Sequence, residues 1–209
     1  MTQVIDFKTA EKNILLNVLN EYPLMDSFNI ANIIEDMMYE DVEEYYPDGN
    51  LTRKYTLSFG EKEGLYKSWF EDGQKWVECT YRDGKEEGLC QRWYDNGQKM
   101  VECHYRDGKL DGLYQRWNGN GKKSEECHYR DGKPEGLYQS WWGNGQKEVE
   151  CTYRDGKREG LYKEWWSNGQ KMIECTYIDG KKDGLYQRWY ENGNKFQECT
   201  YRDGKINNL

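Results

Sequence analysis

The chain has 209 residues, of which 36% are hydrophobic and 15% aromatic, enough to build a core over one or two domains. Its formal net charge is −8, and residues 1–44 account for all of it, because the remaining residues carry equal numbers of acidic and basic side chains. A neutral body does not attract phosphate backbones or anionic lipid. The charge therefore argues against non-specific nucleic-acid binding and electrostatic docking on membranes.

Apolar residues never run for the roughly 18 positions needed to cross a bilayer. The start of the chain, MTQVIDFKTAEKNILL, lacks the basic region and long apolar run of a signal peptide. We therefore expect a cytoplasmic location.

Residues 1–40 are expected to form two helices ahead of any repeat. Thr9 is a suitable N-cap for a helix that runs to about Tyr22, and Asp26 is a suitable N-cap for a second helix. The second helix has apolar residues at helical spacing, namely Ile30, Ile33, Ile34, Met37 and Met38. The segment is expected either to cap the first strands of a sheet or to act as an adaptor for another protein, because acidic, Met-rich helices suit docking surfaces.

Residues 41–63 are expected to form a degenerate first repeat. Within them, YYPDGN at 45–50 aligns with WFEDGQ at 69–74, one 24-residue step later. Pro-Asp-Gly favours a type I turn followed by a left-handed glycine, which is the three-residue hairpin loop.

Residues 64–207 hold six 24-residue repeats with no insertion between them. Each reads G-L-Y-x-x-W-x-x-N-G-x-K-x-x-E-C-x-Y-R-D-G-K-x-x with small departures, and repeats 1 to 6 begin at Gly64, Gly88, Gly112, Gly136, Gly160 and Gly184. Glycine at unit positions 1, 10 and 21 is too frequent for helices, whereas the Tyr, Trp, Thr and Val between them favour strands. The pattern predicts a mainly β, elongated solenoid or ribbon of antiparallel hairpins.

The two glycine turns of each repeat set its predicted faces. N-G or D-G at positions 9–10 and D-G at 20–21 are hairpin signals, and we assign the three-residue loop to both turns. Strand alternation then places Leu 2, Trp 6, Cys 16 and Tyr 18 on a core-facing side, with Tyr 3 and Glu 15 on the opposite side. Two strands at about 4.8 Å each give a rise of about 10 Å per repeat, so we expect a rod that bends near its glycines into a trough.

The repeat resembles the variant form of the MORN family, whose motif runs G-x-x-x-x-W-Y-x-N-G-x-K and then Y-x-D-G-K-x-x-G. The resemblance covers residues 64–207 well, 40–63 weakly and the first forty not at all. Such variant repeats occur in bacterial proteins, some labelled antitoxin-like, and in proteins of large DNA viruses, for which the location would be the host cytoplasm. The family implies an elongated antiparallel β-structure used for scaffolding and protein contacts. Lipid binding is proposed for some members, and there are no catalytic residues to transfer.

Several residues depart from the repeat pattern, and four of the departures matter most. Cys90 replaces the tyrosine at position 3, Asn118 replaces the aromatic residue at position 7, and Glu125 and Gln197 replace the aliphatic residue at position 14. The third repeat is the least regular, and we expect a bend or a feature that a partner reads there.

Cysteine recurs at position 16 of every repeat. Neighbours in this row are expected about 10 Å apart, beyond the roughly 7 Å Cα separation that a disulfide spans. We therefore expect buried free thiols, and no metal site because the chain has no C-x-x-C pair. The row comprises Cys79, Cys103, Cys127, Cys151, Cys175 and Cys199.

No catalytic constellation is expected. His104 and His128 each follow a cysteine, but successive strand residues point to opposite faces, and other repeats hold threonine there, which predicts an exposed position. Glutamate occupies position 15 of every repeat, and a row at constant pitch is typical of cross-strand contacts with Lys and Arg. We expect neither an enzyme nor a cofactor.

Aromatic residues at positions 3 and 7 are the candidate partner-binding groove, because Tyr and Trp dominate interface energetics. We expect a non-enzymatic scaffold or protein-binding module that accepts a peptide or helix there, with carbohydrate as a less favoured occupant. The alternatives are antitoxin-like neutralisation of a specific protein and binding to a lipid surface. The groove candidates are Tyr66, Phe70, Tyr94, Tyr114, Tyr138, Trp142, Tyr162, Trp166, Tyr186 and Tyr190.

The C-terminal end has no segment to cover it. The last strand, expected around 198–201, would expose unpaired backbone groups, so we expect a weak homodimer through the C-terminal repeat. An unidentified protein partner is also expected, and nucleic acid and membrane partners are not.

Overall fold

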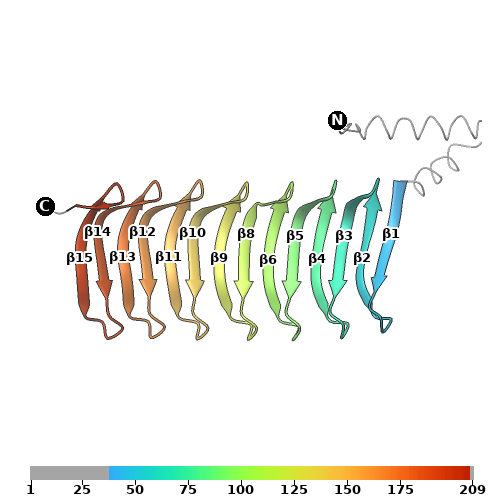
Figure 1. Cartoon of the computed structure of the whole chain (residues 1–209), viewed down its shortest axis with the longest axis horizontal. Helices are drawn as coiled ribbons and strands as arrows, with labels where there is room; N and C mark the ends of the chain where they lie inside the picture. The colour runs from blue at the N-terminus through green and yellow to red at the C-terminus, as the bar shows by residue number, and fades with distance from the viewer. Residues whose placement is uncertain (1–37, 208–209) are drawn as a thin grey trace, which may run out of the picture.

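The computed structural model describes residues 38–207. They form one open antiparallel sheet of 16 strands in which each strand lies next to its neighbours in the sequence, except that the short β7 pairs only with β6. Figure 1 shows the strands side by side along the long axis of the molecule, which confirms the predicted mainly β ribbon. The strands are β1 (Tyr39–Tyr45), β2 (Leu51–Ser58), β3 (Glu61–Trp69), β4 (Lys75–Arg82), β5 (Lys85–Trp93), β6 (Lys99–Arg106), β7 (Lys109–Leu110), β8 (Gly112–Trp117), β9 (Lys123–Arg130), β10 (Lys133–Trp141), β11 (Lys147–Arg154), β12 (Lys157–Trp165), β13 (Lys171–Ile178), β14 (Lys181–Trp189), β15 (Lys195–Arg202) and β16 (Lys205–Ile206).

The helices expected in residues 1–40 fall almost entirely outside the described residues, and β1 begins at Tyr39. β1 and β2 form the hairpin expected of a degenerate first repeat, with the Tyr46 N–H donating to the Asn50 carbonyl at 2.8 Å. Within residues 38–207, no helix has the length and apolar character to cross a bilayer.

The lower row of loops in Figure 1 has three residues, as predicted. In repeat 1 the Phe70 N–H donates to the Gln74 carbonyl at 2.8 Å, and the Gly73 N–H donates to the Phe70 carbonyl at 2.9 Å. Gly73 has a φ of +83°, the left-handed conformation that follows a type I turn in this loop. Equivalent bonds recur in all six repeats.

The upper row of turns in Figure 1 has two residues, so the predicted three-residue loop is wrong there. Arg82 pairs with Lys85 across Asp83 and Gly84, whose φ values are +49° and +72°. Two left-handed residues make a type I′ turn, whose twist matches that of the flanking strands. Aspartate tolerates this conformation better than most side chains because its short polar group bonds locally.

A β-bulge interrupts the hairpin of each repeat. In repeat 1 the pairing steps from Trp69 opposite Lys75 to Ser68 opposite Val77, which leaves Trp76 as the extra residue. The one-residue step exchanges the two faces for the rest of the strand, because side chains alternate along it.

A second irregularity lies where consecutive repeats meet. Gly88 adopts a φ of +75°, and the register shifts between Cys79 and Tyr81 of the neighbouring strand. The prediction that leucine at position 2 faces the core, with tyrosine at position 3 on the other side, is wrong. Tyr66 instead lies opposite Cys79, and the preceding Leu65 is exposed.

The two faces have different compositions and are named here by their residues in repeat 4. The Tyr/Cys face carries unit positions 3, 14, 16 and 18, represented by Tyr138, Val149, Cys151 and Tyr153. The Leu/Trp face carries positions 2, 4, 6, 12, 15 and 17, represented by Leu137, Gln139, Trp141, Lys147, Glu150 and Thr152. The core lies on the Tyr/Cys face, where cysteines are closed over by tyrosine rings from neighbouring strands.

Candidate functional site

The candidate functional surface is the repeat lattice itself, and its lower loops are tied to one another by aromatic side chains. The Tyr94 hydroxyl donates to the Trp117 carbonyl at 3.0 Å, and the Trp142 indole Nε1 donates to the Trp165 carbonyl at 2.9 Å. Each bond joins position 7 of one repeat to the backbone of the next. Phe70 has no side-chain donor and Asn118 makes no equivalent bond among the described residues, so the first and third repeats lack this tie.

The upper turns are tied by backbone and carboxylate groups. The Gly132 N–H donates to the Leu110 carbonyl of the preceding turn at 2.8 Å. The Asp155 N–H donates to the Glu135 carboxylate at 2.9 Å, and the same offset recurs along the sheet. Both rows of turns therefore hold neighbouring repeats at a fixed spacing.

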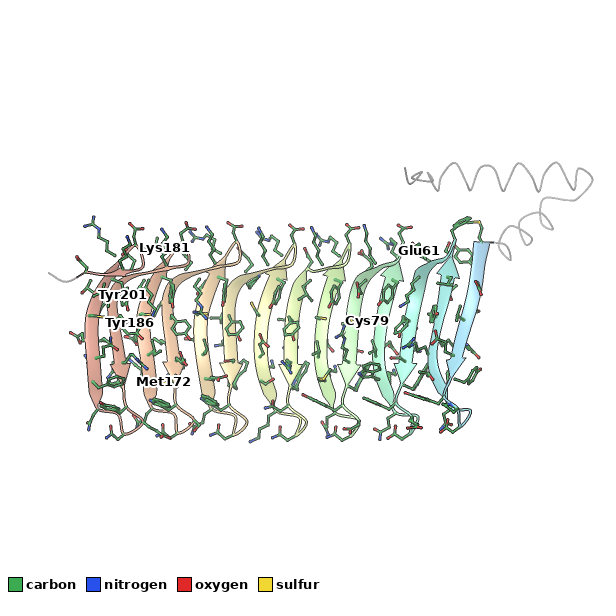
Figure 2. All side chains as sticks on the ribbon, viewed as in Figure 1. Glu61, Cys79, Met172, Lys181, Tyr186 and Tyr201 are labelled. Atoms are coloured by element: carbon green, nitrogen blue, oxygen red, sulfur yellow. A yellow bond between two sulfur atoms is a disulfide. The ribbon has the colours of Figure 1, made fainter. Side chains whose placement is uncertain are left out.

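Tyrosine pairs cover the Tyr/Cys face. The rings of Tyr162 and Tyr177 meet edge to face with centroids 5.8 Å apart, and the Arg158 guanidinium lies 4.7 Å from the Tyr162 centroid. Tyr186 and Tyr201, labelled in Figure 2, also meet edge to face with centroids 5.4 Å apart, and the Lys182 ammonium lies 4.3 Å from the Tyr186 centroid. Burial raises the pKa of the Tyr162, Tyr177 and Tyr186 hydroxyls above the usual tyrosine value.

The ten groove candidates separate into two rows. The position 3 tyrosines lie on the Tyr/Cys face, where Tyr162 and Tyr186 are buried and the other three are half-buried. The position 7 aromatics lie at the lower loops, where Tyr190 is the most exposed at 54%. The prediction that the two rows form a binding groove stays a prediction.

The Leu/Trp face holds the largest regular set of exposed apolar side chains among the described residues. At position 2 the leucines are 42–52% exposed in five repeats, because the irregularity next to each glycine turns them away from the core. Sequence reasoning missed this row, since the bulges that invert the faces have no signal in alternation alone. The exposed members are Leu65, Leu89, Leu137, Leu161 and Leu185.

The position 15 glutamates form a regular contact network, but their cross-strand partners are mostly glutamines rather than the predicted Lys and Arg, and Lys67 to Glu78 at 3.7 Å is the one cross-strand ion pair of this row among the described residues. Lysine at position 12 bridges to the glutamate in every repeat, as in Lys75 to Glu78 at 2.7 Å, and a neighbouring glutamine donates to the same carboxylate in four repeats. The lysine hydrogen bond lowers the pKa of Glu78, Glu102, Glu126 and Glu150. Five of these lysines also lie over tryptophan rings, as in Lys75, whose Nζ is 5.0 Å from the Trp93 centroid. The position 15 glutamates are therefore held by neighbouring lysines and glutamines in a network that suits a structural role.

The prediction that every position 16 cysteine is a free thiol is wrong for Cys79. It forms a disulfide with Cys90, with a Cα–Cα distance of 4.2 Å, because the bulge brings position 3 opposite position 16. The distance argument considered only equivalent cysteines of different repeats and overlooked Cys90. The other five are free, and four of them, Cys103, Cys127, Cys151 and Cys175, are buried as predicted.

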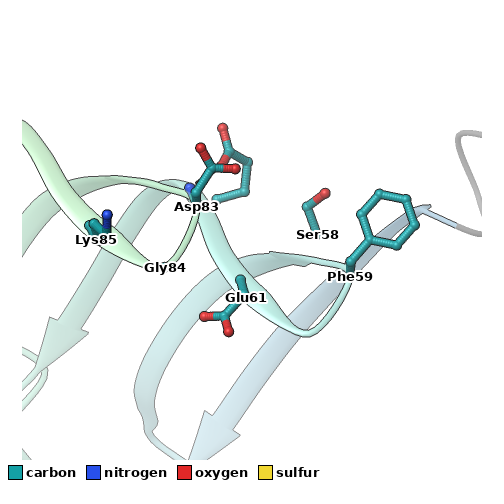
Figure 3. A pocket seen from close by; sticks show the side chains of 7 residues that line it. Ser58, Phe59, Glu61, Asp83, Gly84 and Lys85 are labelled. Atoms are coloured by element: carbon teal, nitrogen blue, oxygen red, sulfur yellow. The ribbon is translucent and has the colours of Figure 1, made fainter. Parts of the chain in front are cut away.

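His104 and His128 are both exposed, as predicted. Within residues 38–207, no group of three or more His, Cys, Asp or Glu side chains is arranged to hold a metal ion. Figure 3 shows a cavity of about 570 Å³ at the first upper turns, where the ring of Phe59 and the carboxylates of Glu61 and Asp83 surround the space.

The C-terminal edge is largely unpaired within the described residues. β15 pairs along its length with β14, but on its other side β16 covers only Tyr201 and Arg202, and the Asn207 N–H reaches the Thr200 carbonyl. Phe196 on this strand is 40% exposed and stacks on Tyr190 with centroids 4.2 Å apart.

Comparisons with known proteins agree with the repeat frame. The family model described as "MORN repeat variant" matches residues 62–83, 86–107, 110–131, 134–155, 158–179 and 182–203. No curated protein matches the chain. Two solved structures are similar over 71% of this chain, one of TarM and one of an S. aureus TarM mutant in complex with Fondaparinux, alpha-GlcNAc-glycerol and UDP. The mutant structure is 10% identical with a TM-score of 0.31 and the other 11% identical with a TM-score of 0.30, and the match spans about a quarter of their length, 27% and 26%.

Proposed function

Because the chain belongs to the MORN repeat variant family, we propose that it is a non-enzymatic scaffold that binds protein partners along its sheet. The repeats supply an elongated surface, and the same contacts recur from one repeat to the next. Carboxylates of the Leu/Trp face are held in a lysine lattice, which suits a structural role.

The exposed leucine row of the Leu/Trp face carries this proposal. Five leucines about half exposed at the same unit position are unusual for a protein that buries its apolar surface, and regular apolar patches of this kind mark interaction sites. The arginines at position 19 lie at the edge of the row, with side chains 68–72% exposed where they pair weakly with carboxylates. A protein partner would bury the leucines and meet the arginines at the rim.

The test is partner capture from the organism that makes the protein. The triple variant Leu137→Thr, Leu161→Thr and Leu185→Thr removes apolar surface at exposed strand positions, where threonine is well tolerated. The control changes the facing threonines, Thr152, Thr176 and Thr200, to serine. A partner that is retained by the control and lost by the leucine variant supports the proposal. Capture of the same proteins by both variants contradicts it.

The aromatic groove and the C-terminal edge are additional surfaces of the proposed module. Tyr190 is the most exposed groove candidate and stacks on the exposed Phe196 at this edge, so both rings are accessible to a partner. Antitoxin-like neutralisation is one form of the same proposal, in which a single toxic protein occupies the surface.

Binding to a lipid surface is a second candidate function, favoured by the exposed arginines beside the leucine row. Arginines bind anionic headgroups while leucines enter the interface, so the two rows together suit a membrane surface. Flotation with vesicles that contain phosphatidylserine, at physiological salt, tests it. Co-flotation that is lost in the leucine variant supports lipid binding, and protein that stays at the bottom of the gradient excludes it.

A further inference from the structure

Three cysteine side chains lie in one row across β4, β5 and β6. Cys90 of β5 is opposite Cys79 of β4 on one side and opposite Cys103 of β6 on the other. Cys79 and Cys90 form the disulfide, and the Cys103 Sγ lies 3.8 Å from the Cys90 carbonyl oxygen. Exposed fractions of 2%, 1% and 2% show that the third sulfur is packed with the other two inside one buried cluster.

This arrangement exists only in the first two repeats. Where position 3 holds tyrosine, a position 16 cysteine faces a ring instead of a thiol, and Tyr138 lies between Cys127 and Cys151 in this way. The single replacement of tyrosine by Cys90 therefore places three cysteines opposite one another on adjacent strands in an otherwise regular lattice.

We propose that Cys79, Cys90 and Cys103 form a thiol–disulfide exchange site in which the disulfide moves from one side of Cys90 to the other. The Cys103 thiolate attacks the Cys90 Sγ, and the bond between Cys90 and Cys79 breaks. The Cys79 Sγ leaves with the electron pair of that bond and takes up the proton that Cys103 released. One S–S bond forms and one breaks, so the step needs no external oxidant or reductant.

The order of the strands favours this displacement. β5 lies between β4 and β6, so the attacking and leaving sulfurs are on opposite sides of Cys90. An attacking sulfur on the side opposite the leaving group has the alignment that a displacement at sulfur requires, and its fixed position raises its effective concentration. Buried thiols are normally inert toward reagents in solution, but an internal exchange requires no access from outside.

The exchange changes which strands are covalently joined. The Cys79–Cys90 bond links repeat 1 to repeat 2, whereas a Cys90–Cys103 bond links the two strands of repeat 2 and leaves Cys79 free. The site therefore controls whether a disulfide cross-links the first repeat to the second in addition to the hydrogen bonds between β4 and β5.

The rate is expected to depend on pH. Burial raises the pKa of the Cys103 thiol, while the Tyr105 hydroxyl and the Arg92 guanidinium act in the opposite direction, and Glu102 and Glu86 raise it further. On the side toward β8 the cluster packs against Tyr114, whose pKa burial raises above the usual tyrosine value. Below the raised pKa of Cys103, each pH unit increases the thiolate fraction about tenfold.

Peptide mapping of the oxidised full-length protein tests the proposal. Trypsin places Cys79, Cys90 and Cys103 in separate peptides, 76–82, 86–92 and 100–106, after free thiols have been blocked with N-ethylmaleimide in acid. We expect the 76–82 to 86–92 link to convert in part to an 86–92 to 100–106 link, about 100-fold faster at pH 9 than at pH 7. The wild-type time course carries the test even where a variant folds poorly.

Two variants separate exchange from random scrambling. Cys103→Ser is expected to hold the first link unchanged at every pH, while Cys127→Ser behaves as wild type, because Cys127 faces tyrosines. Three results would overturn the proposal: no disulfide in the oxidised protein, the first link alone at every time and pH, or links to peptide 124–130, which carries Cys127.

Discussion

At the scale of single residues, the backbone conformation of glycine decides which positions of the repeat can vary. Gly136 and Gly143 both belong to repeat 4, and an added Cβ would meet nothing within 4 Å at either site. They differ in conformation, because Gly136 has a φ of +77° and Gly143 lies outside the left-handed region. Comparing alanine substitutions at the two sites therefore measures the cost of backbone strain without a change in packing.

Gly136→Ala is expected to destabilise the protein by about 1–2 kcal/mol, because alanine is strained at a left-handed φ. Gly143→Ala is expected to change the free energy of unfolding by less than about 0.5 kcal/mol. Urea unfolding followed by tryptophan fluorescence measures both. Equal effects of the two changes would show that the left-handed conformation is not what fixes glycine at position 1.

The placement of a residue was predictable from the sequence where it follows from what recurs at a single unit position. The histidines and the glutamate row are placed as their repetition predicts. Leu65 and Tyr66 were assigned to the wrong faces, because that assignment depends on a bulge around Trp76 that no residue type marks. The Cys79–Cys90 disulfide was missed for the same reason, since Cys90 was placed on the opposite face.

At the scale of the structural element, hydrogen bonds between successive loops hold the repeats in register. The ring donors at position 7 reach the carbonyl at position 6 of the following repeat, and Trp142 to Trp165 is the clearest case at 2.9 Å. Such a bond is made only when both repeats are folded, so it contributes to the interface between them rather than to either hairpin.

Trp142→Phe is expected to lower the free energy of unfolding by about 1 kcal/mol beyond the packing loss, because it leaves the Trp165 carbonyl without its donor. Trp141→Phe is the matched control, since the Trp141 indole makes no hydrogen bond among the described residues. Chemical denaturation of the two variants gives the difference. A larger effect of Trp141→Phe would contradict the role assigned to the loop bond.

The two kinds of turn show which loop conformations could be predicted from the local sequence. The lower loop was predicted because Pro-Asp-Gly at residues 47–49 specifies it. The upper turn was extended to three residues by analogy, although Asp-Gly also specifies the two-residue type I′ turn that Asp83 and Gly84 adopt. The choice between them depends on the register of the whole hairpin.

At the scale of the whole molecule, the same small contribution to stability recurs in several repeats, and the sum is large enough to measure. Five glutamates of the position 15 row have pKa values lowered from 4.5 by their lysine partners, and the four that are not fully exposed are Glu78, Glu102, Glu126 and Glu150. A lowered pKa stabilises the fold at pH values above the unfolded pKa, and this contribution is lost as pH falls through the folded value.

The thermal midpoint is therefore expected to hold between pH 7 and 5 and to fall below about pH 4.5. Changing the four glutamates to glutamine is expected to flatten this fall. A control with Asp83, Asp107, Asp131 and Asp155 changed to asparagine should keep it, because these aspartates make no ion pair among the described residues. Scanning calorimetry across the range measures both, and an unchanged slope in the glutamine variant would count against the lattice.

The C-terminal edge predicts self-association of the whole molecule. Light scattering is expected to show a mass that rises toward a dimer with concentration, because β15 leaves much of its outer side unpaired among the described residues. Phe196→Lys places a charge at this edge and is expected to keep the protein monomeric. Trp76→Lys is the control, since Trp76 occupies the same unit position in repeat 1 and is similarly exposed, 43% against 40%. A wild-type mass that does not change with concentration would contradict the dimer.

Because hydrogen bonds between successive turns hold the repeats at a fixed spacing, the number of repeats sets the length of the protein. Each upper turn bonds to its counterpart one repeat away with a constant offset, so adding or deleting a repeat would lengthen or shorten the molecule in steps of about 10 Å while the upper-turn bonds recur at each junction. Two partners attached at opposite ends would be separated by a distance that the number of tandem copies sets. Gene duplication or loss of one copy would thus adjust a separation between bound molecules while leaving each attachment point unaltered.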